Sequence, residues 1–335
     1  MSIEFTREIQ TATFNNPLED FAETDVEVEI REDPLTGRQT RIVPDAFVEP
    51  ESDPDLDTSV TDGEGCFFCP DMVEEATPTY PDVVGMDRGS VGEATSFPNL
   101  NPYGAHSNVV VLTEDHYVPI EELPADRLAD GLRAALEYVE AVFENDASAT
   151  VASINMNFLP SAGSSIVHPH VQTLVDDRGT NSQRARIEGA REYREETDSE
   201  YFEDVIAATT PTDRYVGTTG EVEWLAPFAP RHHRHVRGIA PERGRLSPDS
   251  AVLPAIARGI EHVLSHYAEV GLNSFNFGLH VADEPSIRPH VDVVARSVFQ
   301  EYAWSDATFF ETIHDESVID VPPEEYARDL STRFC

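Results

Sequence analysis

The sequence predicts an α+β fold made of two similar halves, each an antiparallel sheet with helices packed on it. The segment Ser286–Val293 repeats the pattern of Ile166–Thr173, with the order Pro-His-Val in both. Each copy follows a stretch with apolar residues at three- and four-residue intervals, namely Leu123–Phe143 and Val252–Val270. That spacing is typical of an amphipathic helix. A duplicated unit of helix and strands explains both observations.

The division of the chain follows from this repeat. A chain of 335 residues can bury two domain-sized cores. We expect an acidic arm at 1–30, a first half at 31–177, a helical connection at 178–215 and a second half at 216–335. The first 30 residues and the Asp-, Pro- and Ser-rich stretch Glu49–Glu64 predict loops or mobile arms. Residues 178–204 have charged residues at helix-compatible spacing and predict a solvated helix.

Composition excludes several classes of function. The chain has 63 acidic and 23 basic residues, a net charge of −40, and all of the basic residues are arginine. The absence of lysine excludes lysyl-nucleotide intermediates, Schiff bases and a Walker-type lysine. So negative a chain is not expected to bind nucleic acid, which needs a basic face. Carboxylates spread along the whole chain indicate adaptation to a salt-rich cytoplasm, as in a halophile, because salt screens their repulsion; an acidic mesophilic protein is the alternative.

Cysteine usage and hydropathy bear on the location. Only three cysteines occur, and no apolar run approaches the 18 residues of a membrane span. We therefore expect a cytoplasmic protein that does not enter membranes.

Cys66-Phe67-Phe68-Cys69 has the spacing with which two thiolates bind one tetrahedral Zn²⁺. A redox dithiol or two core cysteines are the alternatives. Because the third cysteine is Cys335, at the end of the chain, histidines must complete a zinc site, and His116 and His168 are the candidates. Two thiolates and two imidazoles would make a closed, structural site.

His168-Pro169-His170-Val171-Gln172 is the most informative segment of the chain. In an extended segment, side chains at alternate positions share a face, so the two histidines and the glutamine are expected to project together. A phosphate oxygen would fit between His170 and the amide of Gln172. A strand with two half-buried histidines is the alternative interpretation.

Six motifs follow one another along the chain: Arg31–Gly37, Cys66–Cys69, Phe97-Pro98-Asn99, Asp115-His116, Asn157 with Gly163-Ser164-Ser165, and His168–Gln172. In their residues and their order they resemble galactose-1-phosphate uridylyltransferase, a branch of the histidine-triad superfamily, and the resemblance covers most of the chain. The C-terminal region resembles the tail of the family in overall pattern, but it lacks the Val-Gly-Tyr-Glu-like string that usually contacts the hexose.

The resemblance implies a role for each matched residue. His170 would attack the α-phosphorus of a UDP-sugar, and Gln172 would hydrogen-bond the uridylyl group of the covalent intermediate. One structural zinc would be bound by Cys66, Cys69, His116 and His168. The residues that would contact base, ribose or phosphates are Arg31, Asn99, Asn157 and Ser165. A second metal, which some members carry, is not expected here, because Arg288 replaces one histidine of the set that includes His280 and His290.

The resemblance also implies an activity. We expect a nucleotidylyltransferase that moves UMP between a nucleotide sugar and a sugar phosphate by a ping-pong mechanism. Histidine-triad hydrolases have an HxHxH motif, and this chain has Gln172 in place of its third histidine. Glutamine cannot act as a proton donor for an attacking water. The alternatives are a nucleotide-sugar or dinucleotide phosphorylase and a non-catalytic nucleotide-binding zinc protein. Members of the family often pair through sheet edges, so a homodimer is a further expectation.

Overall fold

The computed structural model describes residues 3–44, 56, 58–300 and 305–334, and the predicted α+β class is confirmed. A ten-stranded sheet runs in the order β4-β5-β6-β8-β7-β12-β13-β11-β10-β9, and all of its neighbouring strands are antiparallel. The strands from the earlier part of the chain are β4 (Gly89–Val91), β5 (Ala94–Pro98), β6 (His106–Val111), β7 (Val151–Phe158) and β8 (His170–Asp176). The later ones are β9 (Tyr215–Thr219), β10 (Val222–Leu225), β11 (Val236–Ile239), β12 (Phe275–Ala282) and β13 (His290–Ala295).

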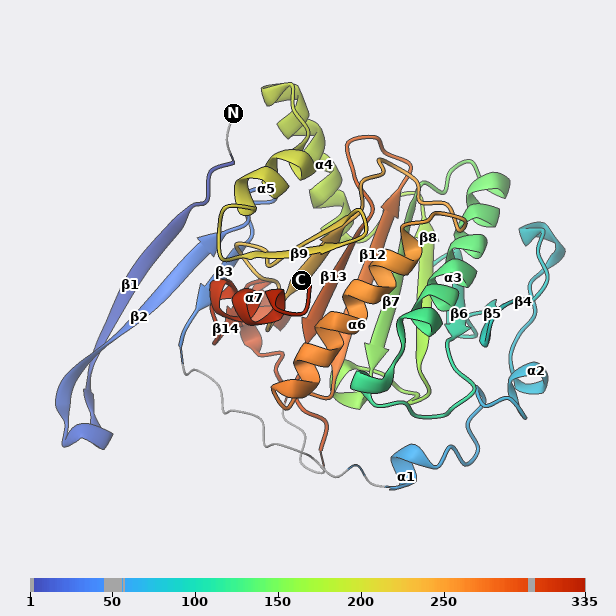
Figure 1. Ribbon diagram of the computed structural model, residues 1–335, viewed down its shortest axis with the longest axis horizontal. Coiled ribbons are helices and arrows are strands. Elements are labelled where there is room, and N and C mark those ends of the chain that lie inside the picture. The colour runs from blue at the N-terminus through green and yellow to red at the C-terminus, as the bar shows by residue number, and fades with distance from the viewer. Residues whose placement is uncertain (1–2, 45–55, 57, 301–304, 335) are drawn as a thin grey trace.

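The strand order is symmetric about the central pair β7 and β12 (Figure 1). The two sets of five strands therefore join edge to edge in one continuous sheet. The backbone repeats as well: the N–H of Leu112 donates to Pro169 O at 2.9 Å, and the N–H of Ala240 donates to Pro289 O at 2.9 Å. These equivalent bonds show that the duplication predicted from the sequence extends to hydrogen-bonding geometry.

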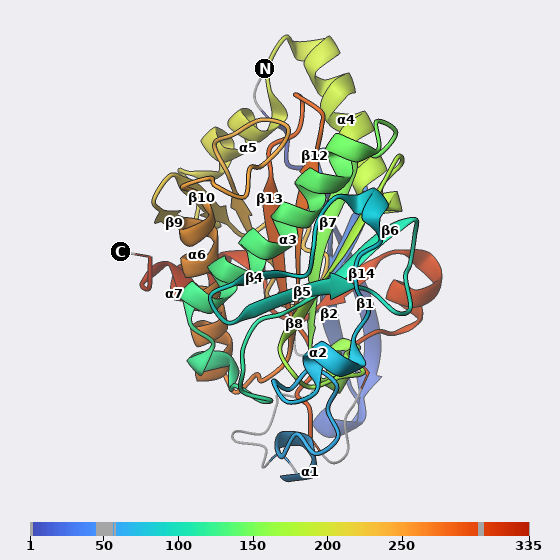
Figure 2. The same ribbon diagram turned by 90° about the vertical axis from the view of Figure 1, so that its right-hand side faces the viewer.

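Two long helices cover one face of this sheet, α3 (Ala125–Asn145) and α6 (Leu253–Glu269), as Figures 1 and 2 show. They lie close to the helices predicted from periodicity. Both pack against the main hydrophobic core, where Trp224 and Tyr267 are fully buried. Apolar positions on this face leave the alternate, polar positions of the strands for the opposite face.

The opposite face is partly covered by α4 (Asn181–Thr197) and α5 (Tyr201–Thr209), which pack through a second apolar cluster that includes Leu225 and Ile239. The connection is helical, but the expectation of a solvated helix was incomplete. Gln183, Arg186 and Ala190 on α4 are buried, because this side of the helix packs against the sheet. Capping by Thr180 fixes where α4 begins: its hydroxyl accepts from the N–H of Gln183.

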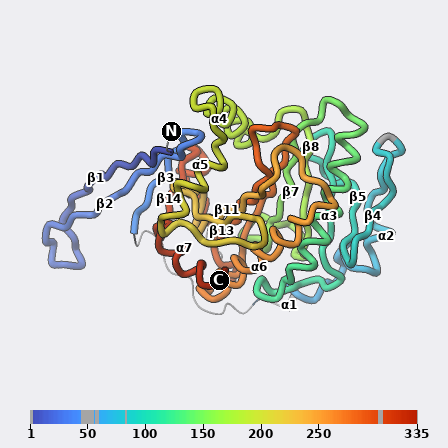
Figure 3. Tube along the Cα trace, turned by 45° about the horizontal axis from the view of Figure 1, so that its top comes forward, coloured from blue at the N-terminus to red at the C-terminus, as the bar shows by residue number. Residues whose placement is uncertain are grey.

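A smaller sheet has the order β1-β2-β3-β14, with β14 parallel to β3. Its strands are β1 (Arg7–Asn16), β2 (Ala22–Glu32), β3 (Gln39–Ile42) and β14 (Ser317–Ile319). The hairpin of β1 and β2 projects from the body (Figures 1 and 3). The expectation of loops over the first 30 residues was therefore wrong in conformation. β-Branched residues at alternate positions of β2, Val26, Val28 and Ile30, favour a strand despite the surrounding carboxylates.

The remaining elements are short, apart from α7 (Pro323–Ser331). They are α1 (Thr58–Thr61), α2 (Val73–Ala76), the 3₁₀ turns η1 (Pro17–Glu19), η2 (Asp82–Val84), η3 (Ile120–Glu122) and η4 (Pro160–Ala162), and the π-helical turn η5 (Phe310–His314). Half of the predicted loop Glu49–Glu64, residues 49–55 and 57, lies outside the described residues, and in the described half Thr58–Thr61 form the short helix α1. Among the helices that the structure describes, none combines the length and the apolar character needed to cross a membrane.

Candidate functional site

Four side chains from three segments of the chain meet in one cluster that could hold a metal ion: Cys66, Cys69, His116 and His168. All of their ligand atoms lie within 4.8 Å of one another. Nδ1 of His168 lies 3.8 Å from Sγ of Cys66 and 3.7 Å from Sγ of Cys69. Nδ1 of His116 lies 3.7 Å from Sγ of Cys69. The structure thus brings together the four residues predicted as ligands.

The spacing of the cluster suits a tetrahedral ion. At a tetrahedral angle, bonds of about 2.3 Å to sulfur and about 2.0 Å to nitrogen place the two ligand atoms about 3.5 Å apart, close to the sulfur–nitrogen distances of 3.7 and 3.8 Å in this cluster. The backbone next to the cluster leaves no room for a side chain at Gly63. Gly63 has φ +70°, and a Cβ added to it would lie 2.9 Å from Cγ of His116. A glycine at this position lets the backbone approach the imidazole closely.

The ring of His168 is held in one orientation. Its Nε2 donates to the carbonyl oxygen of Thr113 at 2.7 Å, which leaves Nδ1 as a lone-pair ligand facing the cysteines. Burial lowers the pKa of His168 to about 4, so the imidazole is neutral, as a ligand must be. Burial raises the pKa of the Cys69 thiol to about 11, and a bound cation would reverse this by favouring the thiolate.

His170 is the first residue of β8 and is 7% exposed. Its Nδ1 lies 2.8 Å from the carbonyl oxygen of His168, which can only accept a hydrogen bond. Nδ1 therefore carries the proton, and Nε2 keeps its lone pair. Burial lowers the pKa of His170, which favours the neutral ring. The ring of Phe68 packs edge-on against it at 5.2 Å between centroids.

Polar side chains follow His170 on the same face of the sheet. Gln172 lies two residues further along β8, and Asn155 of β7 pairs with it in the strand register. Nδ2 of Asn155 donates to the carbonyl oxygen of Gln172 at 3.3 Å. Asn157 is exposed two positions beyond Asn155, on the same face. His168 precedes β8, so of the three residues predicted to project together only His170 and Gln172 belong to the strand.

The other predicted substrate contacts stand on other segments of the chain. Arg31 is buried, and its guanidinium donates to Glu324 at 2.8 and 3.0 Å and to Glu29 at 3.0 Å, at the side of the molecule where α7 lies. Within one chain the structure does not bring Arg31 to His170. The side chain of Asn99 accepts from the N–H of Asn101 at 2.9 Å, and Ser165 is exposed between η4 and β8.

A second polar cluster occupies the equivalent place in the other half of the sheet. His290 begins β13 as His170 begins β8, and its Nδ1 lies 2.8 Å from the carbonyl oxygen of Arg288. Each histidine therefore donates to the carbonyl oxygen two residues before it. Asp292 stands where the first half has Gln172. His280, His290 and Asp292 form a group whose ligand atoms lie within 4.8 Å.

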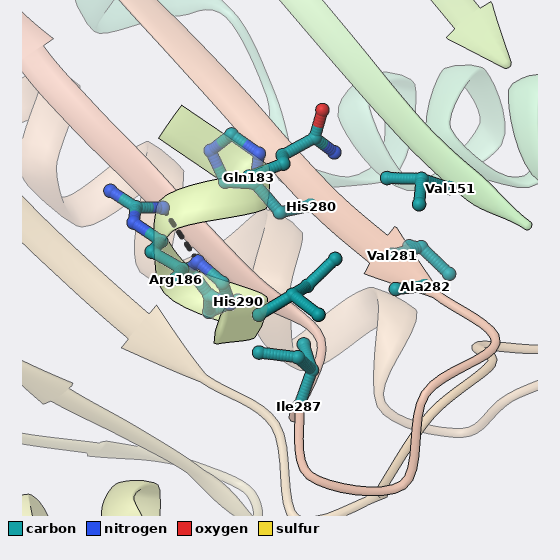
Figure 4. A pocket seen from close by; sticks show the side chains of 9 residues that line it. Val151, Gln183, Arg186, His280, Val281, Ala282, Ile287 and His290 are labelled. Atoms are coloured by element: carbon teal, nitrogen blue, oxygen red, sulfur yellow. Dashed lines mark hydrogen bonds between the residues drawn. The ribbon is translucent and has the colours of Figure 1, made fainter. Parts of the chain in front are cut away.

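Arg186 of α4 contacts this second cluster and lies beside His290 (Figure 4). Its Nη1 lies 2.7 Å from Nε2 of His290, and its Nη2 lies 2.5 Å from Oδ2 of Asp292. Burial alone would raise the pKa of Asp292, but the guanidinium groups of Arg186 and Arg237 hold it well below its usual range. A metal here would adjoin a fixed cation that already engages two of the three ligands, so the arrangement does not fit one.

Several residues around these sites were missed by the sequence analysis. Phe68 stood within the Cys-x-x-Cys segment, but nothing in its spacing indicated contact with His170. Asn155 lies two residues before Asn157, so strand alternation alone would have placed it on the same face. Arg186 gave no signal, because it stands among other charged residues of a helix that the sequence presents as solvated.

The chain was compared with protein-family models, with curated proteins and with solved structures. No protein-family model matches the chain. An uncharacterized protein of Archaeoglobus fulgidus is 36% identical over 307 residues, which are 90% of this chain and 91% of that protein.

Solved structures share the fold. The structure of an ADP-glucose phosphorylase from Arabidopsis thaliana with bound ADP-glucose superposes with a TM-score of 0.68 at 17% identity, over 91% of this chain and 98% of that chain. A structure of uridylyltransferase superposes with a TM-score of 0.63 at 18% identity, also over 91% of this chain and 98% of that one.

Proposed function

This chain belongs to one family with the uncharacterized protein of Archaeoglobus fulgidus and has the fold of the uridylyltransferase structures, and on that premise we propose that it is a nucleotidylyltransferase. It moves UMP from a UDP-sugar to a hexose 1-phosphate. In this proposal residues 31–177 carry the nucleophile and the metal, while 216–335 form the supporting half, joined to the first by 178–215.

The observation that supports this proposal best is the orientation of the His170 ring. Because Nδ1 donates to the carbonyl oxygen of His168, the lone pair of Nε2 is available for attack. Nε2 would form a bond to the α-phosphorus as the bond to the leaving sugar phosphate breaks. An oxygen of the incoming hexose 1-phosphate then attacks the same phosphorus, the P–N bond breaks, and neutral His170 is restored. Splitting the transfer in this way replaces one difficult displacement by two easier ones.

The first cluster would hold Zn²⁺ through Cys66, Cys69, His116 and His168. With all four positions filled by protein, the ion would have a structural role. The ion would fix the backbone of His168, whose carbonyl oxygen orients His170. Phe68, which lies between the two cysteines, contacts the nucleophile directly. The metal would in this way support the geometry of the reaction without touching the substrate.

Intact-mass measurement tests the proposal. The protein is incubated in turn with UDP-glucose, ADP-glucose and diadenosine tetraphosphate. We expect one nucleoside monophosphate to be added per chain, with UDP-glucose the best donor. A protein that stays unlabelled with all three, and that binds neither UMP nor AMP, would overturn the proposed function.

A phosphorylase is the second candidate. The fold is shared with an ADP-glucose phosphorylase at a TM-score of 0.68, and the tail from Phe309 to Pro323 lacks the hexose-contacting string of the uridylyltransferases. Inorganic phosphate would then replace hexose 1-phosphate as the acceptor, with His170 and Gln172 in the same roles. This candidate is favoured if ADP-glucose or diadenosine tetraphosphate labels the protein faster than UDP-glucose does.

Gln172 is proposed to direct the intermediate toward transfer. Replacing it by His should raise the share of intermediate lost to water by about tenfold or more, because a protonatable ring then lies beside the phosphorus and acid–base catalysis typically contributes about 10²–10⁴-fold. Single-turnover release of UMP, with and without acceptor, measures this share. Gln10→His, on the exposed strand β1, is the control. An unchanged share in Gln172→His would remove this residue from the choice between transfer and hydrolysis.

Salt and acceptor can be tested together. With a net charge of −40, the protein should expand and lose activity in dilute buffer, and should need roughly 1 M salt, where the screening length falls to about 3 Å. Small-angle scattering and activity across a salt series measure this. Full activity at 50 mM salt would contradict the salt-adaptation proposal.

The acceptor is tested at the salt concentration that supports activity. There, a hexose 1-phosphate other than galactose 1-phosphate should discharge the intermediate faster than inorganic phosphate does.

A further inference from the structure

We infer that a hydrogen-bond chain from the C-terminal half, running from Asp306 through Arg296 and Asn276, orients the side-chain amide of Asn157 so that its N–H donors face the substrate beside His170. Asn276 and Arg296 are then positioning residues for the phosphate of the bound nucleotide. This inference rests on the proposed function and deepens it, since it assigns the second half of the chain a part in the first half's site.

The direction of the chain is set by the chemistry of its members. Arg296 has only donors, so its Nη1 can contact Asn276 only at the carbonyl oxygen Oδ1, at 2.7 Å. Nδ2 of Asn276 therefore points the other way, and it donates to Oδ1 of Asn157 at 2.7 Å. It also approaches the carbonyl oxygen of Ala162 at 3.0 Å. With its own Oδ1 taken, Asn157 turns Nδ2 outward.

The start of the chain is anchored by a buried carboxylate. Asp306 is 8% exposed and accepts from Nε of Arg296 at 2.9 Å and from Nη2 at 2.7 Å, a two-bond geometry that fixes the guanidinium plane. The N–H of Ser297 donates to the same carboxylate at 2.7 Å. Burial alone would raise the pKa of Asp306, but the bond from Arg296 lowers it, so the acceptor stays ionised.

The end of the hydrogen-bond chain lies on the same face of the sheet as the nucleophile, next to the last pair of β7 and β8. The antiparallel pairing of these strands ends with Asn155 opposite Gln172. Asn157 stands two residues beyond that pair in β7, and His170 stands two residues before it in β8, so both side chains project on the face of Asn155 and Gln172. Asn276 is the partner of Asn157 in the neighbouring strand β12, at the central seam of the sheet (Figure 1). The hydrogen bond from Asn276 of β12 to Asn157 of β7 therefore lets the second half of the sheet orient a side chain of the first half.

An amide that offers only N–H groups is selective for acceptors. The phosphate that His170 would attack carries oxygen acceptors and no donors, so the outward Nδ2 of Asn157 suits it, whereas an outward carbonyl oxygen would oppose its charge. Asn157 is exposed, which leaves this group accessible to a ligand. The fixed orientation saves the substrate from having to select one of two amide rotamers.

The test uses Asn276→Asp in the full chain. Aspartate keeps the acceptor for Arg296 but cannot donate, so Asn157 must turn its own Nδ2 inward and its Oδ1 outward. We expect affinity for UMP or AMP, whichever the wild type binds, to fall by about tenfold to a hundredfold, the usual cost of losing a hydrogen bond to a charged group. Affinity for the matching nucleoside, which has no phosphate, should stay within about twofold. Calorimetric titration measures both.

Three further variants complete the test. Asn273→Asp adds the same charge and loses one amide donor just before β12, without touching the chain to Asn157, and should keep the wild-type ratio of nucleotide to nucleoside affinity. If Asn276→Asp does not fold, Arg296→Met should lower that ratio, and Arg296→Gln, which can still donate to Asn276, should restore part of it.

The outcomes distinguish a failure of the proposed function from a failure of the orientation inferred for Asn157. A wild type that binds no nucleotide and is not labelled overturns the proposed function, and this inference with it. A wild type that binds nucleotide, together with an Asn276→Asp variant that keeps the wild-type ratio, overturns the orientation alone. Equal weakening of nucleotide and nucleoside overturns the assignment of Asn157 to the phosphate.

Discussion

His170→Gly should receive no nucleoside monophosphate from any donor that labels the wild type. Glycine removes the only group proposed to bond the phosphorus, while β8 keeps its backbone pairing with β6. Turnover should fall by on the order of 10³-fold or more, as expected when a covalent nucleophile is lost. Intact-mass measurement after incubation with donor gives the result directly, and thermal unfolding of the same sample shows whether the variant is folded.

The second half of the chain offers a matched control. His290 has the same Nδ1 contact as His170, but its Nε2 lies 2.7 Å from Nη1 of Arg186, which leaves no lone pair for a substrate. Burial, and then the charge of Arg186, hold the pKa of His290 well below its usual range. His290→Gln should therefore still be labelled once per chain. Labelling that survives in His170→Gly but disappears in His290→Gln would exchange the roles of the two histidines.

Cys66→Ser should lose the metal and much of the thermal stability. A serine hydroxyl is a poor ligand for zinc, and the three remaining ligands would hold the ion weakly. Because metal binding at such a site is coupled to folding, the melting temperature should fall by on the order of 10 °C. Metal analysis by mass spectrometry and scanning calorimetry measure the two effects. Labelling of His170 should fall too, since Phe68 and the carbonyl of His168 would lose their support.

Cys335→Ser is the control, because it removes the third cysteine of the chain, which is not one of the four predicted ligands. It should keep one metal ion per chain and the wild-type melting temperature. Full metal content in Cys66→Ser would place the ligands elsewhere. Two ions per wild-type chain would show that the cluster of His280, His290 and Asp292 binds metal in spite of Arg186.

Local features of the sequence determined much of the fold. Apolar spacing near 3.6 residues predicted the helices now seen as α3 and α6, because the period of a helix depends only on neighbours in the chain. The repeat of Pro-His-Val predicted the duplication, because a repeat can be recognised in the sequence without knowledge of the fold. Cys66 and Cys69 could be predicted as candidate metal ligands, because two residues between thiolates suffice to form the knuckle. The chemistry proposed for His170 and Gln172 could be predicted because both residues stand within five consecutive positions.

Tertiary structure decided what depends on partners distant in the chain. At the acidic start of the chain, Val26, Val28 and Ile30 favour a strand, but only the tertiary structure shows its partner: β1 and β2 form a regular hairpin whose strands supply each other's hydrogen bonds. Arg186 looks like any other charged residue of a solvated helix, and only the packing of α4 on the sheet brings it to His290 and Asp292.

The orientation of Asn157 shows the same division at the scale of one amide. The sequence placed an asparagine near the motif, but it could not say which atom faces outward. That choice depends on Asn276, which is 119 residues away in the chain, and on Arg296 and Asp306 behind it. A periodic pattern records which face of an element is buried. The direction of a hydrogen bond is fixed only when the fold brings a donor to its acceptor.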